Sequence, residues 1–431
     1  MTVAMETKCC IAGGGPAGMM LGVLLARAGI PVVVLEKHAD FLRDFRGDTV
    51  HPSTLEVMHE LGVLDEFLAR PHSEMRQTRG VIGDERVTIA DFTHLPVHAP
   101  FIAMVPQWDF LDFLAQFGRR YPTFELLMRA EAFELIERDA RICGVRVAMP
   151  DGAMDLYADL VVGADGRTST IRDLARLPVK EIGAPIDVLW IRLPRHPDDD
   201  RTAALGNIRN GRVFVMLDRG DYWQCAYVIP KGGYEELRQR GLDAFRASIV
   251  GVVPFLADRV SAIASWSDVK LLTVRIDRLR QWHRPGLLCI GDAAHAMSPI
   301  GGVGINLAIQ DAVAAANLLY KPLQRGVPTA AELQAVQRRR ELPTRITQRM
   351  QVIVQNTVLV RTLQAKGPVK VPRAVRLLDR HPVLRRIPAR LVGMGFRPEH
   401  VRTPEYEPRR HGELRKPNPP AAPSDGRPQQ D

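Results

Sequence analysis

The first stretch of this chain that could do chemistry is a run of glycines between two apolar segments. Gly13, Gly15 and Gly18 stand at the first, third and sixth places of the run, and Pro16 and Ala17 lie between them. Glycines at these places allow a tight turn, a close approach of the backbone to a pyrophosphate, and close packing of a helix on a strand. The pattern predicts a phosphate-binding turn at the start of a helix. The alternative is an ordinary glycine turn.

Two acidic residues end apolar runs where a nucleotide would need hydrogen-bond acceptors. Glu36, with Lys37 beside it, ends the run after the glycine turn, at the spacing of a residue that binds ribose hydroxyls. Asp165 ends a later apolar run and precedes Gly166 and a Ser/Thr cluster that can cap a helix. On its own, Asp165 is better explained as an aspartate that bonds its own backbone in a turn.

The most specific segment runs from residue 291 to residue 306 and combines an acid with many glycines. Asp292 follows an apolar run, where its carboxylate can accept a hydrogen bond from a sugar-like hydroxyl. The glycines after it strip side chains from a loop, so that a flat ring can lie against backbone. A helix starting near Gly304 would direct its positive end at that ring and stabilise a reduced, anionic form. The candidate residues of this segment are Gly291, Asp292, Pro299, Gly301, Gly302, Gly304, Ile305 and Asn306.

A parallel sheet is the element that can bring these three segments together. Residues 8–12 and 31–36 have the pattern of buried strands, and the apolar stretch 17–28 between them predicts a helix that ends at a glycine. This order is a βαβ unit with parallel strands. The apolar runs before Asp165 and Asp292 predict two more strands that are buried on both faces.

The predicted fold is α/β, with a Rossmann-like domain interrupted by a second, mostly antiparallel sheet and followed by C-terminal helices. Breaks in these helices are predicted at Pro322, Pro328 and Pro343. The predicted boundaries are 1–80, 100–181 and 275–345 for the nucleotide-binding domain, 81–99 and 182–274 for the substrate-binding domain, 346–403 for a basic helical region, and 404–431 for a disordered tail.

In this order and at these spacings, the three segments resemble the para-hydroxybenzoate hydroxylase family of single-component FAD-dependent monooxygenases, over about residues 8–345. The resemblance implies that the glycine turn, Glu36, Asp292 and the loop 301–306 bind FAD. It also implies that Asp165 belongs to a motif that the family shares between FAD and NAD(P)H binding.

Two further residues enter through the resemblance alone. Arg46 and Gln107 match positions that contact the FAD in relatives. Without the resemblance, Arg46 would be a solvated loop charge and Gln107 a polar residue at the start of a helix.

The reaction that the resemblance implies uses NADH or NADPH to reduce the FAD. Oxygen then adds to give a hydroperoxyflavin, which hydroxylates a small aromatic or polyketide-like molecule. The protein must position the substrate, exclude water and tune the ring. No catalytic acid or base is nominated, because His51 and His295 are better explained as hydrogen-bonded structural histidines.

Other function classes are weighed against this hypothesis. A flavin-dependent halogenase would share the nucleotide fold, but its tryptophan pair would fall on Cys225 and Tyr227, so that signature is broken. A non-catalytic flavin-fold binding protein would have little use for three glycine-rich segments. A quinone-type or lipid-type hydroxylase at a membrane surface is the further alternative, because of the C-terminal region.

The C-terminal region carries the net charge of the chain. Residues 361–431 hold 16 Lys/Arg and 7 Asp/Glu, which accounts for the formal charge of +9. Between residues 369 and 392, aliphatic side chains alternate with arginines, as in helices that lie on anionic membrane surfaces. We favour instead a terminal helix that packs its apolar stripe on the catalytic domain, and keep peripheral membrane contact as the alternative.

The bulk composition predicts a folded cytoplasmic protein. Apolar residues make up 46% of the chain and charged residues 25%, within the ordinary range for soluble proteins. The first residues lack the features of an export signal, and no apolar run is long enough to cross a bilayer. Five cysteines without metal-ligand spacing predict no metal site, and the basic residues do not form a nucleic-acid recognition module.

Overall fold

The computed structural model describes residues 3–42, 49–199, 206–365, 367 and 369–406. Its larger sheet is built around five parallel strands. In spatial order these are β20 (Leu287–Cys289), β11 (Gly152–Gly163), β1 (Val3–Ala12), β2 (Val32–Glu36) and β8 (Phe124–Met128). Antiparallel strands extend it, namely β9 (Glu131–Arg138), β10 (Arg141–Met149) and β19 (His283–Arg284).

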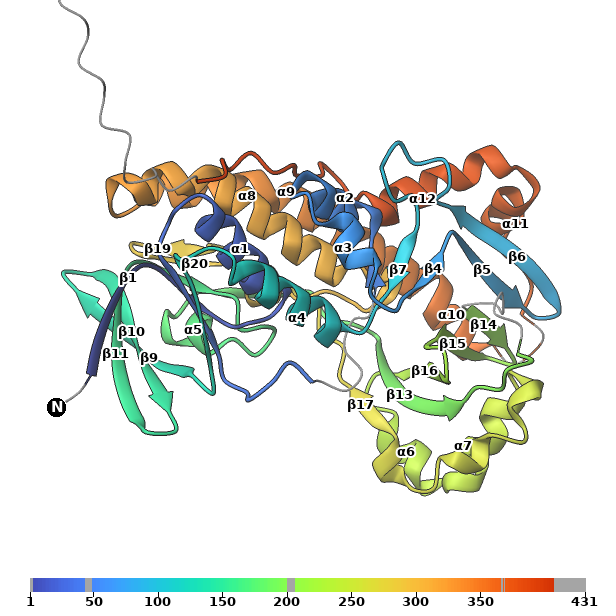
Figure 1. The fold of residues 1–431 in the computed structure, drawn as a ribbon. Coiled ribbons are helices and arrows are strands. Elements are labelled where there is room, and N and C mark those ends of the chain that lie inside the picture. Colours follow the sequence, from blue (N-terminus) through green and yellow to red (C-terminus); the bar gives the residue numbers. More distant parts are fainter. Residues whose placement is uncertain (1–2, 43–48, 200–205, 366, 368, 407–431) are drawn as a thin grey trace, which may run out of the picture.

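Three helices lie side by side over this sheet. Helix α1 (Pro16–Arg27) packs between α4 (Gln107–Gly118) and α8 (Gly304–Arg325), as Figure 1 shows. Residues 17–26 of α1 are all buried and all apolar or glycine, because neighbouring helices and the sheet surround the helix. The predicted strand, helix and strand of the βαβ unit are confirmed.

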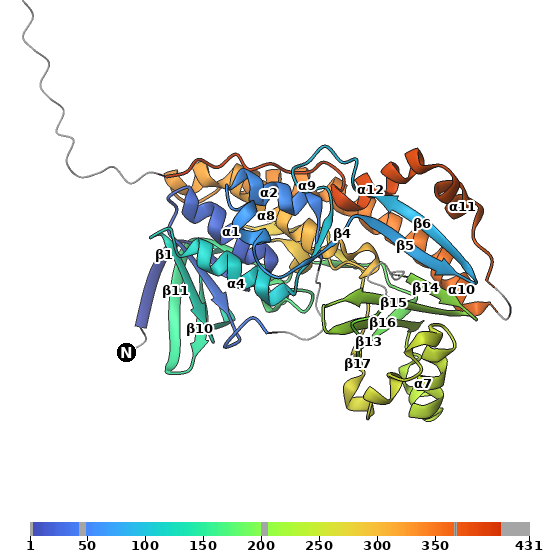
Figure 2. The same cartoon turned by 45° about the vertical axis from the view of Figure 1, so that its right-hand side comes forward.

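The second sheet is mostly antiparallel and lies beside the first domain. Its spatial order is β17 (Lys270–Leu272), β13 (Ile186–Pro194), β16 (Tyr222–Pro230), β15 (Arg212–Asp218), β14 (Gly206–Arg209), β5 (Gln77–Ile82) and β6 (Glu85–Asp91). Among the described strands of this sheet, only the β14–β5 pair is parallel. Two helices, α6 (Tyr234–Gln239) and α7 (Leu242–Val250), lie on the side of this sheet that faces away from α8 (Figure 2). The predicted fold class is confirmed.

The remaining elements connect and cover the two sheets. They are β3 (Thr49–Val50), α2 (Pro52–Glu60), α3 (Leu64–Leu68), β4 (Ser73–Met75), β7 (Ile102–Met104), α5 (Thr170–Leu174), β12 (Val179–Glu181), β18 (Asp277–Leu279), and the 3-10 turns η4 (Gly291–Ala293) and η5 (Ile300–Gly302). Strands β3, β7 and β4 form a small sheet of their own between the two larger sheets.

The C-terminal third is helical, but two of its three predicted breaks are wrong. Pro322 lies inside α8 and Pro343 lies inside α9 (Ala330–Val354). Helix α9 starts with a capping box between Thr329 and Glu332, and its packing against α8 outweighs the backbone bond that Pro343 cannot donate. Only Pro328 lies between the two helices. The stretch Ile300–Arg325 is long and apolar enough to cross a membrane, but 78% of its most apolar window is buried inside the protein.

Past α9, short helices run over the edge of the second sheet. They are the π-turn η6 (Gln355–Leu359), α10 (Val360–Gln364), α11 (Arg373–Arg380), the 3-10 turn η7 (Pro382–Arg385) and α12 (Arg386–Gly393). Helices α11 and α12 both pack on β6. The chain then returns to α1, where the Tyr406 N–H donates to the Arg27 carbonyl at 2.7 Å. The described chain therefore continues to residue 406, past the predicted tail boundary at residue 404, and residues 407–431 lie outside it.

Candidate cofactor-binding site

The glycine turn after β1 is shaped by contacts that exclude side chains. Gly13 has φ of +111°, and a Cβ on it would lie 2.4 Å from the Ala164 carbonyl oxygen. A Cβ on Gly18 would lie 1.9 Å from the Gly13 carbonyl oxygen. The turn therefore needs glycine at both positions, because helix α1 sits directly on the strand that precedes it.

The start of α1 is open. Gly15 is its N-cap residue and provides no side-chain cap, and a Cβ on Gly15 would find its nearest neighbour only at 4.0 Å. Pro16 occupies the first turn, where its missing N–H costs nothing. Helix N–H groups without a side-chain partner, beside glycine backbone with free space, can bind a phosphate.

Glu36 ends β2 next to this turn. Its carboxylate accepts hydrogen bonds from the backbone N–H of Gly14 at 3.2 Å and of His38 at 3.0 Å. Lys37 points away into solvent, within 3.8 Å of Glu131. Glu36 thus stands against the glycine turn, where the ribose role requires it, while the geometry gives Lys37 only a surface ion pair.

Strand register brings the three candidate segments to one edge of the sheet. Ala12 pairs with Leu35 on one side and with Gly163 on the other, and Gly163 pairs with Cys289. The carboxyl ends of four neighbouring parallel strands therefore meet, which is where open α/β sheets bind ligands.

Two acids at this edge have different surroundings. Asp165 accepts hydrogen bonds from the Ser169 hydroxyl and from the Ile171 N–H at 3.0 Å, and burial raises the pKa of its carboxyl. The N-cap of α5 is Ser169, from the Ser/Thr cluster that was predicted to cap a helix, and Asp165 accepts from the first turn of the same helix. Asp292 is partly exposed and accepts from the Arg167 guanidinium at 3.2 Å, so the second and third segments are joined by a charged pair.

The loop after Asp292 presents bare backbone at the start of α8. Gly301 and Gly302 have φ of +78° and +62°, which residues with a Cβ rarely adopt. A Cβ on Gly304 would find no atom within 4 Å, and the N-cap Val303 supplies no side-chain cap. The residue types and the free space fit a flat ring at a positive helix end.

Asn306 ties this loop to helix α2. Its side-chain amide oxygen accepts hydrogen bonds from the backbone N–H of His51 at 3.3 Å and from the Thr54 hydroxyl at 2.7 Å. Both acceptor bonds fix the amide orientation, so Asn306 positions the loop rather than presenting its oxygen to a cofactor. Pro299 lies in this loop, directly before η5, and Ile305 lies in the first turn of α8.

His51 is a buried neutral histidine beside the loop. Its Nδ1 is 2.9 Å from the Val392 carbonyl oxygen, so Nδ1 carries the proton and Nε2 is bare. Burial lowers the pKa of His51 from 6.5 to about 4. A Cβ on Gly302 would lie 3.4 Å from Nε2, which places this unprotonated nitrogen against the glycine loop.

His295 belongs to a buried charged chain that anchors the other end of the loop. Its Nε2 lies 2.6 Å from Asp311, whose carboxylate also accepts from the Gly291 N–H at 3.1 Å and from Arg340 at 2.9 Å. Burial opposes the charge on Asp311, but His295 and Arg340 outweigh it and lower the pKa of the carboxyl. The structural interpretation of His295 fits this geometry.

Sequence reasoning missed a set of glutamines on α9 that holds the same loop. Gln351 accepts from the Ser298 N–H at 3.1 Å and donates to the carbonyl oxygens of Ser298 at 2.9 Å and Ile300 at 3.0 Å. Gln348 donates to the carbonyls of Asp277 and Ala296. The signal was present, because glutamines at 348, 351 and 355 recur with the spacing of one helix face.

The remaining predicted residues are placed as follows. Gln107 is the first residue of α4, partly buried, and Ala17 lies in the first turn of α1, where a Cβ on Gly291 would touch it at 3.1 Å. Arg46 lies outside the described residues. Within the part of the chain that the structure describes, no group of three or more His, Cys, Asp or Glu side chains could hold a metal ion.

Comparisons with known proteins agree with this geometry. A family model described as an FAD binding domain matches residues 6–350. The chain is 34% identical to 6-methylpretetramide 4-monooxygenase of Streptomyces rimosus, over 93% of this chain and 96% of that protein.

Solved structures share the fold. PqsL, a probable FAD-dependent monooxygenase from Pseudomonas aeruginosa, aligns with a TM-score of 0.70 at 22% identity, over 83% of this chain and 97% of that one. The myxobacterial halogenase CndH aligns with the same TM-score at 18% identity, over 87% of this chain and 96% of that one. At these identities the likeness concerns the fold alone.

Proposed function

This chain belongs to the FAD-binding-domain family, as a para-hydroxybenzoate hydroxylase-like monooxygenase, and on that basis we propose that it hydroxylates an aromatic or polyketide-like molecule with NAD(P)H and O2. One observation carries the proposal. Three glycine-bearing segments meet at the carboxyl ends of four parallel strands, and Gly15, Gly166 and Gly304 in these segments leave free space where side chains would otherwise stand.

Different residues at this edge of the sheet would bind different parts of FAD. The first turn of α1 would hold the pyrophosphate, and Glu36 would bind the adenosine ribose. Asp292 would accept a hydrogen bond from a ribityl hydroxyl, and the start of α8 would lie near the ring. The segment of Arg46 and the start of α4 at Gln107 complete the set that the family resemblance implies.

Bound FAD would supply the redox chemistry. It would take electrons from NADH or NADPH and use them to activate O2, so that one oxygen atom could enter the substrate and the other could leave as water. The polypeptide would contribute a fixed ring position and a helix end that favours negative charge. His51 is neutral at physiological pH and cannot supply a proton there.

The substrate class is inferred from the relatives. A relative that is 34% identical over nearly the full length of both chains is named 6-methylpretetramide 4-monooxygenase. The halogenase alternative has less support, because Cys225 and Tyr227 are both buried in β16 at the positions of the tryptophan pair. We place the protein in the cytoplasm, where its five free cysteines would stay reduced.

The test measures NADH and NADPH oxidation by the FAD-loaded protein against a panel of phenols and polycyclic polyketides. Oxygenated product and hydrogen peroxide are quantified separately, with chloride or bromide added in parallel. Substrate-stimulated oxidation with one oxygenated product per NAD(P)H supports the proposal. A halogenated product, or a purified protein that binds no FAD, would overturn it.

A further inference from the structure

Apolar side chains project into solvent from the last helices. Leu377 on α11 is 50% exposed, Val383 on η7 67% and Ile387 on α12 58%. Val383 is the most exposed large hydrophobic residue of the described chain. Together with Leu384, these three residues form a surface that we call the apolar tip.

Arginines surround the apolar tip. Arg373, Arg380, Arg386 and Arg390 are exposed, and none of them forms an ion pair with an acid in the described residues. The one acid of these helices, Asp379, is already engaged, because it accepts from the Thr88 N–H at 2.8 Å and lies 3.7 Å from Arg385. The surface is therefore cationic without internal compensation.

Other contacts fix α11, η7 and α12 on the domain, so the exposure of the apolar tip does not come from a segment that has failed to pack. Arg376 pairs with Glu85 on β6 at 3.1 Å, and Ala389 is fully buried against Phe92 and Leu95. Each helix thus has an inward face that packs on β6 and an outward face that carries the apolar tip. The expectation that the terminal apolar stripe packs entirely on the catalytic domain accounts for the inward face only.

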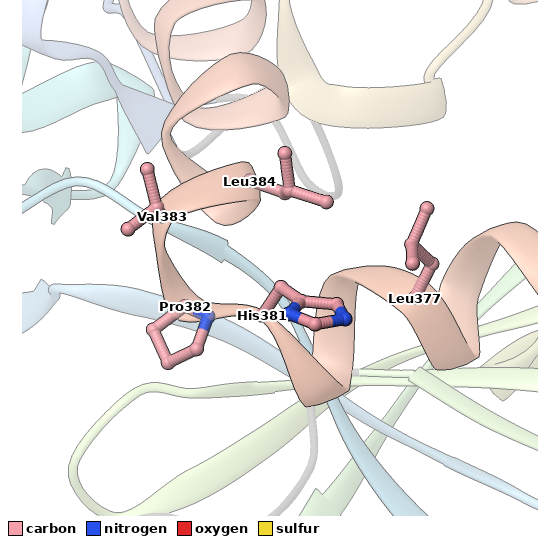
Figure 3. A pocket seen from close by; sticks show the side chains of 5 residues that line it. All are labelled: Leu377, His381, Pro382, Val383 and Leu384. Carbon is pink, nitrogen blue, oxygen red and sulfur yellow. The ribbon is translucent and has the colours of Figure 1, made fainter.

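The shape of the surface argues against a specific side-chain pocket. Leu377 and Leu384 flank an open hollow, with His381 and Pro382 at the turn that links α11 to η7 (Figure 3). An open surface that carries aliphatic side chains, beside guanidiniums that have no acidic partner among the described residues, matches a fluid layer with phosphate groups at its surface.

We propose that the α11–α12 surface docks on an anionic lipid membrane. Guanidiniums bind lipid phosphates, while the apolar tip enters the boundary between headgroups and acyl chains. Docking would also place the cofactor site near the lipid, because Val392 on α12 accepts the hydrogen bond of His51 beside the glycine loop. Together with the proposed function, on which this step rests, docking at a membrane implies an apolar substrate that partitions into membranes.

The experiment uses full-length, FAD-loaded protein and flotation with phosphatidylcholine vesicles, with and without phosphatidylglycerol. Binding is measured without NAD(P)H or substrate, so the result does not depend on the hydroxylation reaction. We expect binding to the anionic vesicles alone, and release by salt, because Debye screening weakens attraction to the charged surface.

Matched variants identify the docking residues. Val383→Asp and Arg386→Ala should weaken binding, Arg386→Ala by about fivefold, which corresponds to about 1 kcal/mol per basic residue near an anionic surface. Val327→Asp and Arg338→Ala change exposed residues of the same types on other parts of the surface and should leave binding unchanged. All four variants should keep wild-type FAD content and turnover.

Several results would overturn the proposal. These are no flotation with either vesicle, equal flotation with both, or anionic binding that all four variants leave intact. Retention by an acidic protein without vesicle binding would also overturn it, in favour of a protein partner. Vesicle binding by a protein that hydroxylates nothing would leave the docking intact and refute the proposed function.

Discussion

Helices α1 and α9 both pack into the nucleotide-binding domain, yet they bury opposite kinds of side chain. Residues 17–26 of α1 are buried and carry no polar side chain. The second half of α9 buries Gln348, Gln351 and Thr344, while Leu342 and Ile353 on its other face are 49% and 52% exposed. The difference lies in what each helix covers.

A strand satisfies its own backbone through the sheet, so α1 needs only to exclude water from it. The loop covered by α9 has no such ladder, and its buried N–H and C=O groups need partners from side chains. Glutamine supplies a donor and an acceptor on one amide, as Gln351 does for Ser298 and Ile300. An irregular buried loop therefore requires a polar helix face.

The largest loss of stability is predicted for a substitution in α1. Gly18→Val places a branched side chain where even a Cβ would meet the Gly13 carbonyl oxygen. We expect a loss of more than about 3 kcal/mol and little soluble FAD-loaded protein. Thermal melting and FAD content of the purified variant check this; a stable, yellow Gly18→Val protein would show that α1 does not rest on the turn as described.

The next prediction breaks the α9 side. Gln351→Leu leaves the Ser298 N–H and two carbonyl oxygens buried without partners, at a cost of about 3 kcal/mol in unfolding free energy. The matched control is Gln334→Leu on the exposed face of the same helix, which should change stability by less than about 0.5 kcal/mol. Denaturant unfolding of both variants measures the difference, and equal costs would refute the role of the buried amide.

A third prediction sharpens the contrast, because the polar surroundings of the loop contain a titratable group. The pKa of folded His51 is lowered from 6.5 to about 4, so the unfolded chain takes up the proton first as pH falls. The stabilisation is complete above pH 6.5 and is lost between pH 6.5 and 4. We expect a loss of about 2 kcal/mol on going from neutral pH to about pH 5. His51→Gln should remove that part of the pH dependence; an unchanged stability profile would contradict the burial of a neutral ring.

The smallest effect on stability is expected for Gly304→Val, the counterpart of Gly18→Val in the first turn of α8. Its Cβ would find no atom within 4 Å, so the fold should tolerate it within about 1 kcal/mol. The side chain would instead intrude where the flavin ring is expected. A displacement of about 1 Å can cost on the order of 100-fold in product formation. Peroxide should rise relative to product, and normal coupling would mean that the ring lies elsewhere.

Much of the fold was predictable because its signals are local. Apolar runs and glycine turns predicted β1, α1 and β2, and the glycine segments predicted that a cofactor binds at the edge of the sheet where they meet. The glutamine face of α9 was not recognised, since its polarity is reversed relative to an ordinary amphipathic helix. The break predicted at Pro343 is wrong for a different reason, because long-range packing decides whether a helix continues through a proline and sequence spacing does not report packing.

The contact between the end of the described chain and its first helix bears on how the protein is made. Arg27 donates to the Thr403 carbonyl oxygen across 376 residues, and Tyr406 covers Gly29. At roughly 5–20 residues per second, α1 is synthesised roughly 20–75 s before this partner segment. During that time the apolar surface that Tyr406 later covers is exposed on the nascent chain. Chaperone binding should therefore concentrate on nascent chains that end before residue 403.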